Sequence, residues 1–269
     1  LYNGVSFSSS DGGSLTFDGT NDYAEITSAS GLGNFSGDFT IEVWIYVQDT
    51  STSRTVLGTC ANISGRGGIY FGTSSTNFIF YQYITNTTLL TAAITPHAWN
   101  HVAAVRNGSV ITLYINGTSV GTSTFANGFT GNSANGGIGD YYENGGYGFS
   151  GYMSDMRVVN GTAVYTSAFT PPTAPLTKVT NTKLLLNFTN ASIIDQTGKT
   201  NIKTGGNAQL DTSVKKFGTA SYEGDGSPSS FLTLSNSKLI PKGTQSFTVE
   251  CFIYINSPHK NYNNIYSGA

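Results

Sequence analysis

The sequence predicts an all-β protein in which antiparallel sheets form a sandwich. Glycine is abundant, with 33 residues, aromatic residues reach 13% and charged residues only 10%. Such a composition argues against disorder and is typical of short strands joined by tight turns. Many short segments alternate between apolar and polar residues, and clusters of Ser, Asn, Gly or Thr separate them. This alternation has the period of a strand and not of a helix.

The clearest strand is Phe39–Val47, FTIEVWIYV, in which aliphatic residues and Phe39 hold the odd numbers while Thr, Glu, Trp and Tyr hold the even ones. We expect it at the centre of a sheet. The same pattern returns at 247–255 as FTVECFIYI, an offset of 208 residues (247 − 39). Upstream, 15–19 and 23–26 match 220–224 and 231–234 in the same order. Repetition of this extent indicates a duplicated domain.

The offset of 208 residues suits one complete β-domain. We therefore expect one domain over residues 1–190 and the N-terminal part of a second, incomplete domain over 191–269. The sequence is then expected to be a fragment of a longer protein, because so few strands cannot close the second core. Cys251 stands where the first copy has Val43, so we expect a small buried hydrophobe there.

The other strands of the first domain follow from alternation and turn residues. The pairs Asn107-Gly108 and Asn116-Gly117 supply the positive φ that tight hairpins need. A helical turn fits only residues 162–167, and Pro171, Pro172 and Pro175 indicate an extended crossing after it. Besides Phe39–Val47, strands are expected over 2–10, 14–17, 22–26, 55–59, 68–72, 77–83, 88–94, 99–105, 110–115, 118–122, 138–142, 148–159 and 183–188.

Charge and hydropathy exclude two classes of partner. The net charge is −2 and no run of Lys or Arg occurs, so a nucleic-acid partner is not expected. No apolar stretch is long enough to span a bilayer, so we expect no membrane insertion.

Several motifs carry a resemblance to a known family. In chain order they are Phe17-Asp-Gly with Asp22-Tyr23, residues 39–44, Trp99-Asn-His-Val102, residues 113–117, and 151–157. Together they resemble the laminin-G-like, concanavalin A-like lectin and glucanase jelly rolls, which implies a jelly-roll β-sandwich in tandem. Residues 160–172 with 184–187 are similar to tandem repeats in structural proteins of marine, especially cyanobacterial, bacteriophages.

Catalysis is not expected. The resemblance includes β-glucanases, whose chemistry needs paired carboxylates on one strand, as in E-x-D-x-x-E. The sequence contains no such motif, and Glu42 and Glu250 stand alone on their strands. The three histidines lie in no nucleophile motif, and no Cys/His cluster could hold zinc.

Glu42, Trp44 and Tyr46 share one face of the Phe39–Val47 strand. The resemblance implies a concave sheet on which an aromatic ring stacks on a sugar while a neighbouring carboxylate binds its hydroxyls. The alternative is a half-buried Trp44 with Glu42 paired to Arg157. The first interpretation makes the three residues a glycan-binding site.

A calcium site is a second candidate. Asp18, Asn21 and Asp22 bring oxygen ligands together in one turn, and the resemblance makes Ca²⁺ plausible there or with Asp155. Alternatively, such turns bond their own backbone. In the second copy Glu223 replaces Asp18, so calcium need not bind there.

Residues 140–147 form an aromatic and acidic segment with glycines, and Tyr141, Tyr142 and Tyr147 make it a candidate recognition loop. The rings could equally cover one end of the core.

These observations favour a non-catalytic binding or structural module of a repeat-containing virion or extracellular fibre protein. Its expected partners are glycans or other virion and surface proteins, and homo-oligomers or filaments fit a repeated domain. The alternatives are a carbohydrate-targeting module of a larger polysaccharide-active enzyme and a cellular adhesin.

Overall fold

The computed structural model divides the chain into two compact units, Leu1–Thr189 and Asn190–Ala269. In the first unit it describes residues 2–3, 6–8, 13–26, 32, 34–59, 68–130, 136–140 and 146–186. In the second it describes 202–205, 209–211, 213–217, 221–224, 230–234 and 248–255. No helix occurs in these ranges, so the described residues contain no helix that could cross a membrane.

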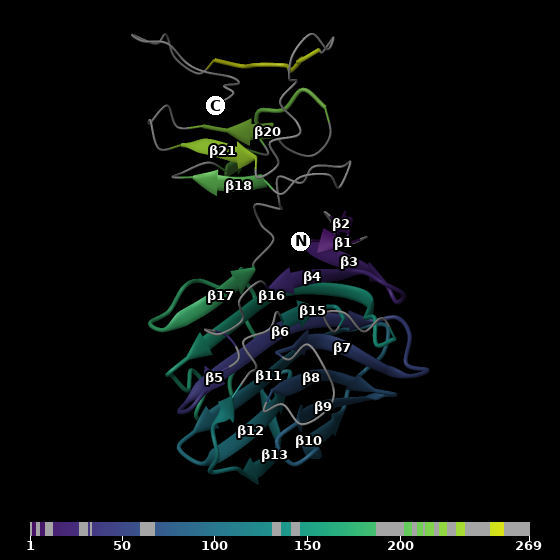
Figure 1. Cartoon of the computed structure of the whole chain (residues 1–269), viewed down its shortest axis with the longest axis vertical. Coiled ribbons are helices and arrows are strands. Elements are labelled where there is room, and N and C mark those ends of the chain that lie inside the picture. The colour runs from purple at the N-terminus through teal and green to yellow at the C-terminus, as the bar shows by residue number, and fades with distance from the viewer. Residues whose placement is uncertain are drawn as a thin grey trace. The chain divides into compact units, whose positions relative to one another are not determined.

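The first unit is an antiparallel sandwich, as the sequence predicts (Figure 1). One sheet has seven strands, in the order β1 (Tyr2–Asn3), β4 (Tyr23–Ile26), β15 (Gly136–Ile138), β7 (Ser53–Gly58), β8 (Ile69–Ser74), β9 (Asn77–Gln82) and β10 (Thr87–Ala93). The other has eight: β13 (Thr118–Thr124), β12 (Val110–Ile115), β11 (Trp99–Asn107), β6 (Phe39–Val47), β16 (Ser150–Asn160), β3 (Ser14–Asp18) and β2 (Ser6–Ser8), with β17 (Thr182–Leu186) also paired to β16.

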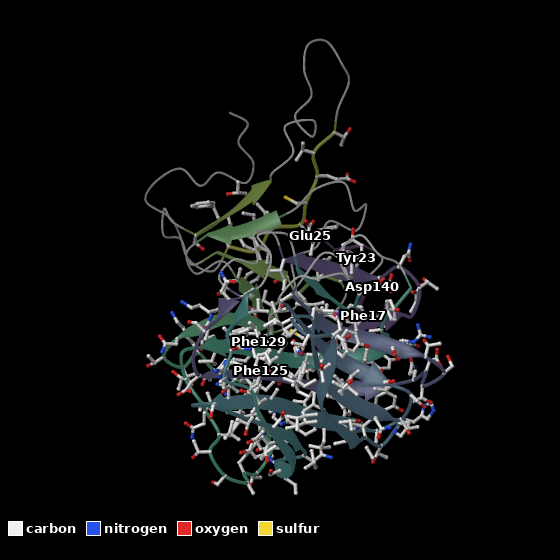
Figure 2. All side chains as sticks on the ribbon, turned by 60° about the horizontal axis from the view of Figure 1, so that its bottom comes forward. Phe17, Tyr23, Glu25, Phe125, Phe129 and Asp140 are labelled. Atoms are coloured by element: carbon white, nitrogen blue, oxygen red, sulfur yellow. The ribbon has the colours of Figure 1, made fainter. Side chains whose placement is uncertain are left out.

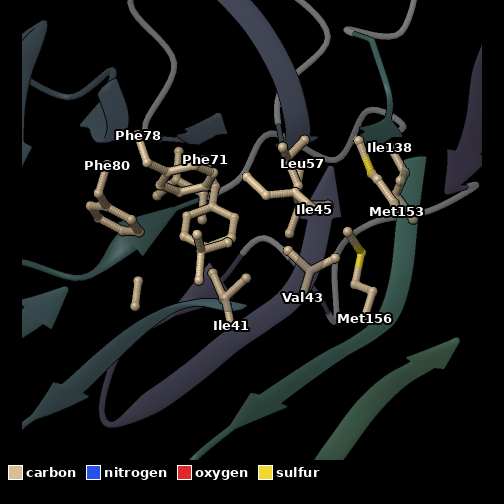
Figure 3. Packing of buried hydrophobic residues seen from close by; sticks show 14 of the residues in the cluster. Ile41, Val43, Ile45, Leu57, Phe71, Phe78, Phe80, Ile138, Met153 and Met156 are labelled. Carbon is tan, nitrogen blue, oxygen red and sulfur yellow. The ribbon is translucent and has the colours of Figure 1, made fainter. Parts of the chain in front are cut away.

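The expected central strand is confirmed, because β6 lies between β11 and β16 in the eight-stranded sheet. Its odd-numbered residues Ile41, Val43 and Ile45 are fully buried in the core, close to aromatic residues of the other sheet such as Phe71 and Phe80 (Figure 3). Each such burial stabilises the fold by about 1.5–3 kcal/mol. The even-numbered side chains of β6 therefore lie on the outer face of this sheet.

Several strand ends differ from expectation. The strand expected over 138–142 ends at Ile138, since Gly139 has φ 87° and a Cβ there would lie 2.1 Å from the Phe17 ring. The sequence does not indicate β5 (Asn34–Phe35) and β14 (Phe129–Thr130), which pair with each other across a long separation in the chain. Phe125 stacks on Phe129 beside that pair (Figure 2).

Residues 161–181, which we call the strap, contain no strand and no helical turn. The Thr40 hydroxyl explains why 162–167 do not form a helical turn: it donates to the Thr162 carbonyl and accepts from the Val164 N–H. Both backbone groups are thereby bound to the sheet. The strap forms the expected extended crossing and leads into β17.

The second unit contains two antiparallel strand pairs, β18 (Ile202–Gly205) with β21 (Phe231–Leu234) and β19 (Gln209–Asp211) with β20 (Ser221–Glu223). β20 and β21 thus occur in the two segments, 220–224 and 231–234, whose sequences repeat 15–19 and 23–26. The strand expected over 247–255 is not found: the described residues 248–255 form none. Their side chains are exposed, and so is Cys251, contrary to expectation. In the first unit the odd-numbered residues of the same pattern are buried, because β6 lies between β11 and β16 and faces aromatic residues of the other sheet. That this unit is a second copy of the domain stays a prediction.

Candidate functional site

A row of three aromatic side chains crosses the outer face of the eight-stranded sheet. Strand register places Trp99 of β11 opposite Tyr46 of β6, and Tyr46 opposite Tyr152 of β16. The Tyr46 ring centroid lies 5.8 Å from that of Trp99 and 5.7 Å from that of Tyr152, both in edge-to-face contact. All three residues are half-buried. Each ring is thus held by its neighbours while part of it remains accessible.

Trp44 extends this row by one step along β6. It is half-buried and lies edge-to-face against the buried His101 ring, with centroids 5.2 Å apart. We call Trp44, Tyr46, Trp99 and Tyr152 the aromatic patch. Rings with one accessible side can cover the apolar face of a flat ligand, and nearby hydroxyl and indole N–H groups can bind its polar edge.

Glu42, the third residue predicted on this face, is fully buried. Its Oε1 accepts from Arg157 Nε at 2.8 Å and Nη2 at 2.6 Å, and its Oε2 accepts from the Tyr165 hydroxyl at 2.8 Å. The carboxylate is therefore not accessible to a ligand. The structure shows the alternative, in which Glu42 pairs with Arg157.

The negative charge of the buried Glu42 carboxylate is balanced by its neighbours. Burial alone would raise the pKa of Glu42, but the hydrogen bond with His101 and the positive charge of Arg157 outweigh it, and the pKa is lowered. His101 Nε2 lies 3.2 Å from Glu42 Oε2. Glu42 is thus ionised at neutral pH and fixed by three side chains.

The strap covers Glu42. The Tyr165 ring stacks on Phe169 with centroids 3.6 Å apart, and Phe169 lies edge-to-face on His101. The Phe169 N–H donates to the Gly117 carbonyl at 3.0 Å. Arg157 Nη1 donates to the Thr177 carbonyl at 2.8 Å. The strap is therefore bound to the sheet through both side chains and backbone.

The predicted calcium ligands Asp18 and Asp22 bind backbone groups of their own turn. Asp18 Oδ1 accepts from the Thr20 N–H and hydroxyl, and Asp22 Oδ2 accepts from the Asp18 N–H, all within 2.8 Å. The Thr20 hydrogen bonds lower the pKa of Asp18, while burial raises that of Asp22. Asp155 accepts from the Leu176 N–H. It lies five positions along β16 from the residue opposite Asp18, roughly 16 Å away.

The described part of the chain contains no group of three His, Cys, Asp or Glu residues that could hold a metal ion. The turn bonds its own backbone, as the alternative expects. Calcium at Asp18, Asn21 and Asp22 stays a prediction, whereas Asp155 is too distant to share the ion.

Tyr141 and Tyr142 lie outside the described residues. Tyr147 is exposed, and its carbonyl accepts from the Thr55 N–H of β7 at 2.8 Å. Its backbone thus joins the seven-stranded sheet, while Trp44 and Tyr46 belong to the eight-stranded sheet. The structure does not bring these two predicted surfaces together.

Trp99 and Tyr152 were not predicted as site residues. Alternation along each strand places them on the same side as Tyr46, since Val102 and Met153 are buried in the core. The register that brings the three rings into one row depends on strand pairing between distant segments, which the sequence does not specify. The contribution of Tyr165 and Phe169 was also missed, since no periodic pattern marks an irregular strap.

The comparisons with known proteins agree with this fold. Residues 18–178 match the family described as the concanavalin A-like lectin/glucanases superfamily. No curated protein sequence gives a significant match. A putative carbohydrate-binding protein from Bacteroides ovatus is 18% identical with a TM-score of 0.52, covering 68% of this chain and 56% of that one.

Two further structures are similar at lower TM-scores. One is domain 4 of AbnA, a GH43 extracellular arabinanase from Geobacillus stearothermophilus, in complex with arabinotriose. It is 18% identical with a TM-score of 0.49, and the match covers 60% of this chain and 78% of that one. Domains LG4-5 of the mouse laminin alpha1 chain are 16% identical, with a TM-score of 0.42 and 61% and 47% coverage. Because the family match spans more than half of the sequence, the chain belongs to the concanavalin A-like lectin/glucanases superfamily.

Proposed function

We propose that this chain is a non-catalytic module that binds neutral glycans through the aromatic patch. The observation that carries the proposal is the row Trp99, Tyr46 and Tyr152, three half-buried rings in edge-to-face contact across neighbouring strands. Pre-positioned rings lose little side-chain entropy on binding and bury a large area. Membership of a superfamily that includes lectins supports the same ligand class.

The charge around the patch favours a neutral ligand. No patch residue is charged, and the neighbouring Glu42 carboxylate and Arg157 guanidinium neutralise each other under the strap. A sulfated or acidic sugar would find no accessible cation among the patch residues, whereas uncharged sugar rings can stack on them.

We also propose that the module performs no hydrolysis. Glycoside cleavage needs two carboxyl groups on either side of the bond. On the outer face of the eight-stranded sheet, Glu42 is held by Arg157 and Tyr165, and Asp155 accepts from the Leu176 N–H. Glu42 is therefore not available as an acid or a nucleophile, so Asp155 lacks the partner carboxyl group that this chemistry needs.

The context that we propose is a repeat-containing virion or other extracellular fibre. The duplicated sequence supports it, because linked weak sites raise apparent affinity when their geometry permits simultaneous binding. Contacts with other virion or surface proteins, including copies of this chain in an oligomer or filament, are part of the same proposal.

Binding of neutral oligosaccharides to the whole chain tests the glycan proposal, with a glycan array followed by calorimetry. Trp99→Ala should weaken the best array ligand at least tenfold, which corresponds to about 1.4 kcal/mol. The matched control is Tyr81→Ala, since Tyr81 is a half-buried tyrosine of β9 in the other sheet. Circular dichroism checks that both variants fold. Equal affinities of the two variants, or no glycan binding by the wild-type chain, would overturn the proposal.

A further inference from the structure

A groove of about 240 Å³ lies elsewhere on the same outer face. Its floor comes from Val105 and Asn107 of β11 and from Val110, Thr112 and Tyr114 of β12. The strap contributes Tyr165 and Thr166. The groove includes no residue of the aromatic patch. Along β11, Val105 lies six positions from Trp99, roughly 20 Å away.

Tyr165 is a rigid part of this groove. One face of its ring stacks on Phe169 at an interplanar angle of 7°, and its hydroxyl donates to Glu42 Oε2 at 2.8 Å. Only the other face and the edges of the ring are left to contact a ligand. Burial beside the negative charge of Glu42 raises the pKa of Tyr165, so the hydroxyl remains a neutral donor. The ring is therefore in place before any ligand arrives, which lowers the entropic cost of binding.

The chemistry of the lining specifies the kind of ligand. None of the lining residues is charged. Val110 is exposed and offers apolar surface, the half-buried Tyr165 offers a ring, and Thr112, Thr166 and Asn107 offer hydroxyl and amide groups, while Val105 and Tyr114 are almost fully buried. Such a mixture fits a ring with apolar faces and several hydroxyl groups. The volume is below the 300–1,000 Å³ or so of pockets for drug-sized ligands, so it suits a single ring.

We propose that this groove is a second binding site, which takes one neutral pyranose residue. The choice of ligand class rests on the proposed glycan-binding function, but the site itself is independent of the aromatic patch. The strap separates the two, since Tyr165 and Phe169 cover the buried Glu42 and His101. One sugar chain therefore cannot lie on the sheet surface between the two sites.

The test uses the whole chain and a panel of neutral methyl pyranosides, detected by saturation-transfer NMR and titrated by chemical-shift changes. The background variant is Trp99→Ala/Tyr152→Ala, which lacks two rings of the patch. This variant is expected to retain binding of at least one pyranoside. Adding Thr112→Trp, which fills the groove, should abolish it.

A second substitution guards against misfolding by the bulky tryptophan. Asn107 is exposed, and Asn107→Ala should weaken pyranoside binding about fivefold through the loss of one hydrogen bond. The control Ser119→Ala alters an exposed residue of β13 outside the groove and should change nothing.

Two results would overturn the second site: a background variant that binds no pyranoside, or one whose binding is unaffected by Thr112→Trp and Asn107→Ala. If the wild-type chain still binds oligosaccharides through the patch, the proposed function survives this failure. If the wild-type chain binds no neutral glycan, both proposals fail.

Discussion

Glu42 shows how one residue can satisfy a sequence pattern and serve another purpose. Like Trp44 and Tyr46, Glu42 alternates along β6 with residues of the core. Unlike them, it is 0% exposed and accepts hydrogen bonds from Arg157 and Tyr165. A buried ion pair contributes little net stability, but removal of one partner leaves an uncompensated charge. Glu42 therefore fixes the strap to the sheet and is fully buried there.

At the residue scale we predict that Glu42→Gln destabilises the protein by about 3–5 kcal/mol at pH 7, because Arg157 then lacks its counter-charge. The pKa of Glu42 lies below its ordinary value of 4.5. Its contribution is therefore complete above pH 4.5 and is lost as the pH falls through the lowered pKa. The difference in unfolding free energy between variant and wild type should shrink below pH 4.5.

Urea unfolding from pH 7 to pH 3 measures this difference. The control is Lys183→Met, a change to an exposed residue of β17, which should alter stability by no more than about 0.5 kcal/mol at any pH. A cost of Glu42→Gln that stays constant across this range would contradict the ion pair.

At the scale of elements, the turn between β12 and β13 determines where the strap lies. Gly117 has φ 76°, and a Cβ there would be 1.8 Å from the Phe169 carbonyl oxygen. Gly108, in the preceding hairpin, has φ 62° but nothing within 4 Å of such a Cβ. Both glycines have a left-handed conformation, but only Gly117 lies against the strap.

We predict that Gly117→Ala destabilises the protein by at least about 2 kcal/mol more than Gly108→Ala does. Both variants incur the cost of positive φ, about 1 kcal/mol, but only Gly117→Ala displaces the strap backbone. Thermal unfolding of both variants measures the difference. Equal melting temperatures would show that the strap does not depend on this close approach.

The same scale separates what the sequence can and cannot predict. Period-2 alternation suffices for β6, β11 and β12, because each strand buries one face in the core. It fails for β5 and β14, since two residues carry no period, and for the strap, which is positioned by Gly117 and Glu42. The row of Trp99, Tyr46 and Tyr152 needed the register between strands far apart in the sequence, so alternation alone predicted only its central residue.

For the whole molecule, the sequence predicts the fold and the family of the first unit, whereas the described residues of the second unit include no counterpart of β6. Residues 248–255 repeat the sequence pattern of β6, but they form no strand and their side chains are exposed. Both candidate sites belong to the unit Leu1–Thr189.

At this scale we predict that the chain does not cleave β-glucans. A reducing-end assay with β-1,3- and β-1,4-glucans should give the same rate for wild type and for Glu42→Gln, equal to the rate without protein. Measurable cleavage by the wild-type chain would contradict this prediction, and circular dichroism of Glu42→Gln would then separate loss of the carboxylate from loss of the fold.

The aromatic patch also supplies the chain with a built-in optical probe. The sequence contains two tryptophans, Trp44 and Trp99, and both belong to the patch. All indole fluorescence of the 269 residues therefore originates on this face of one sheet. A ligand that covers the patch should change the emission, while a ligand in the groove, roughly 20 Å along β11, contacts neither indole. Unlabelled protein can thus report which of the two sites is occupied.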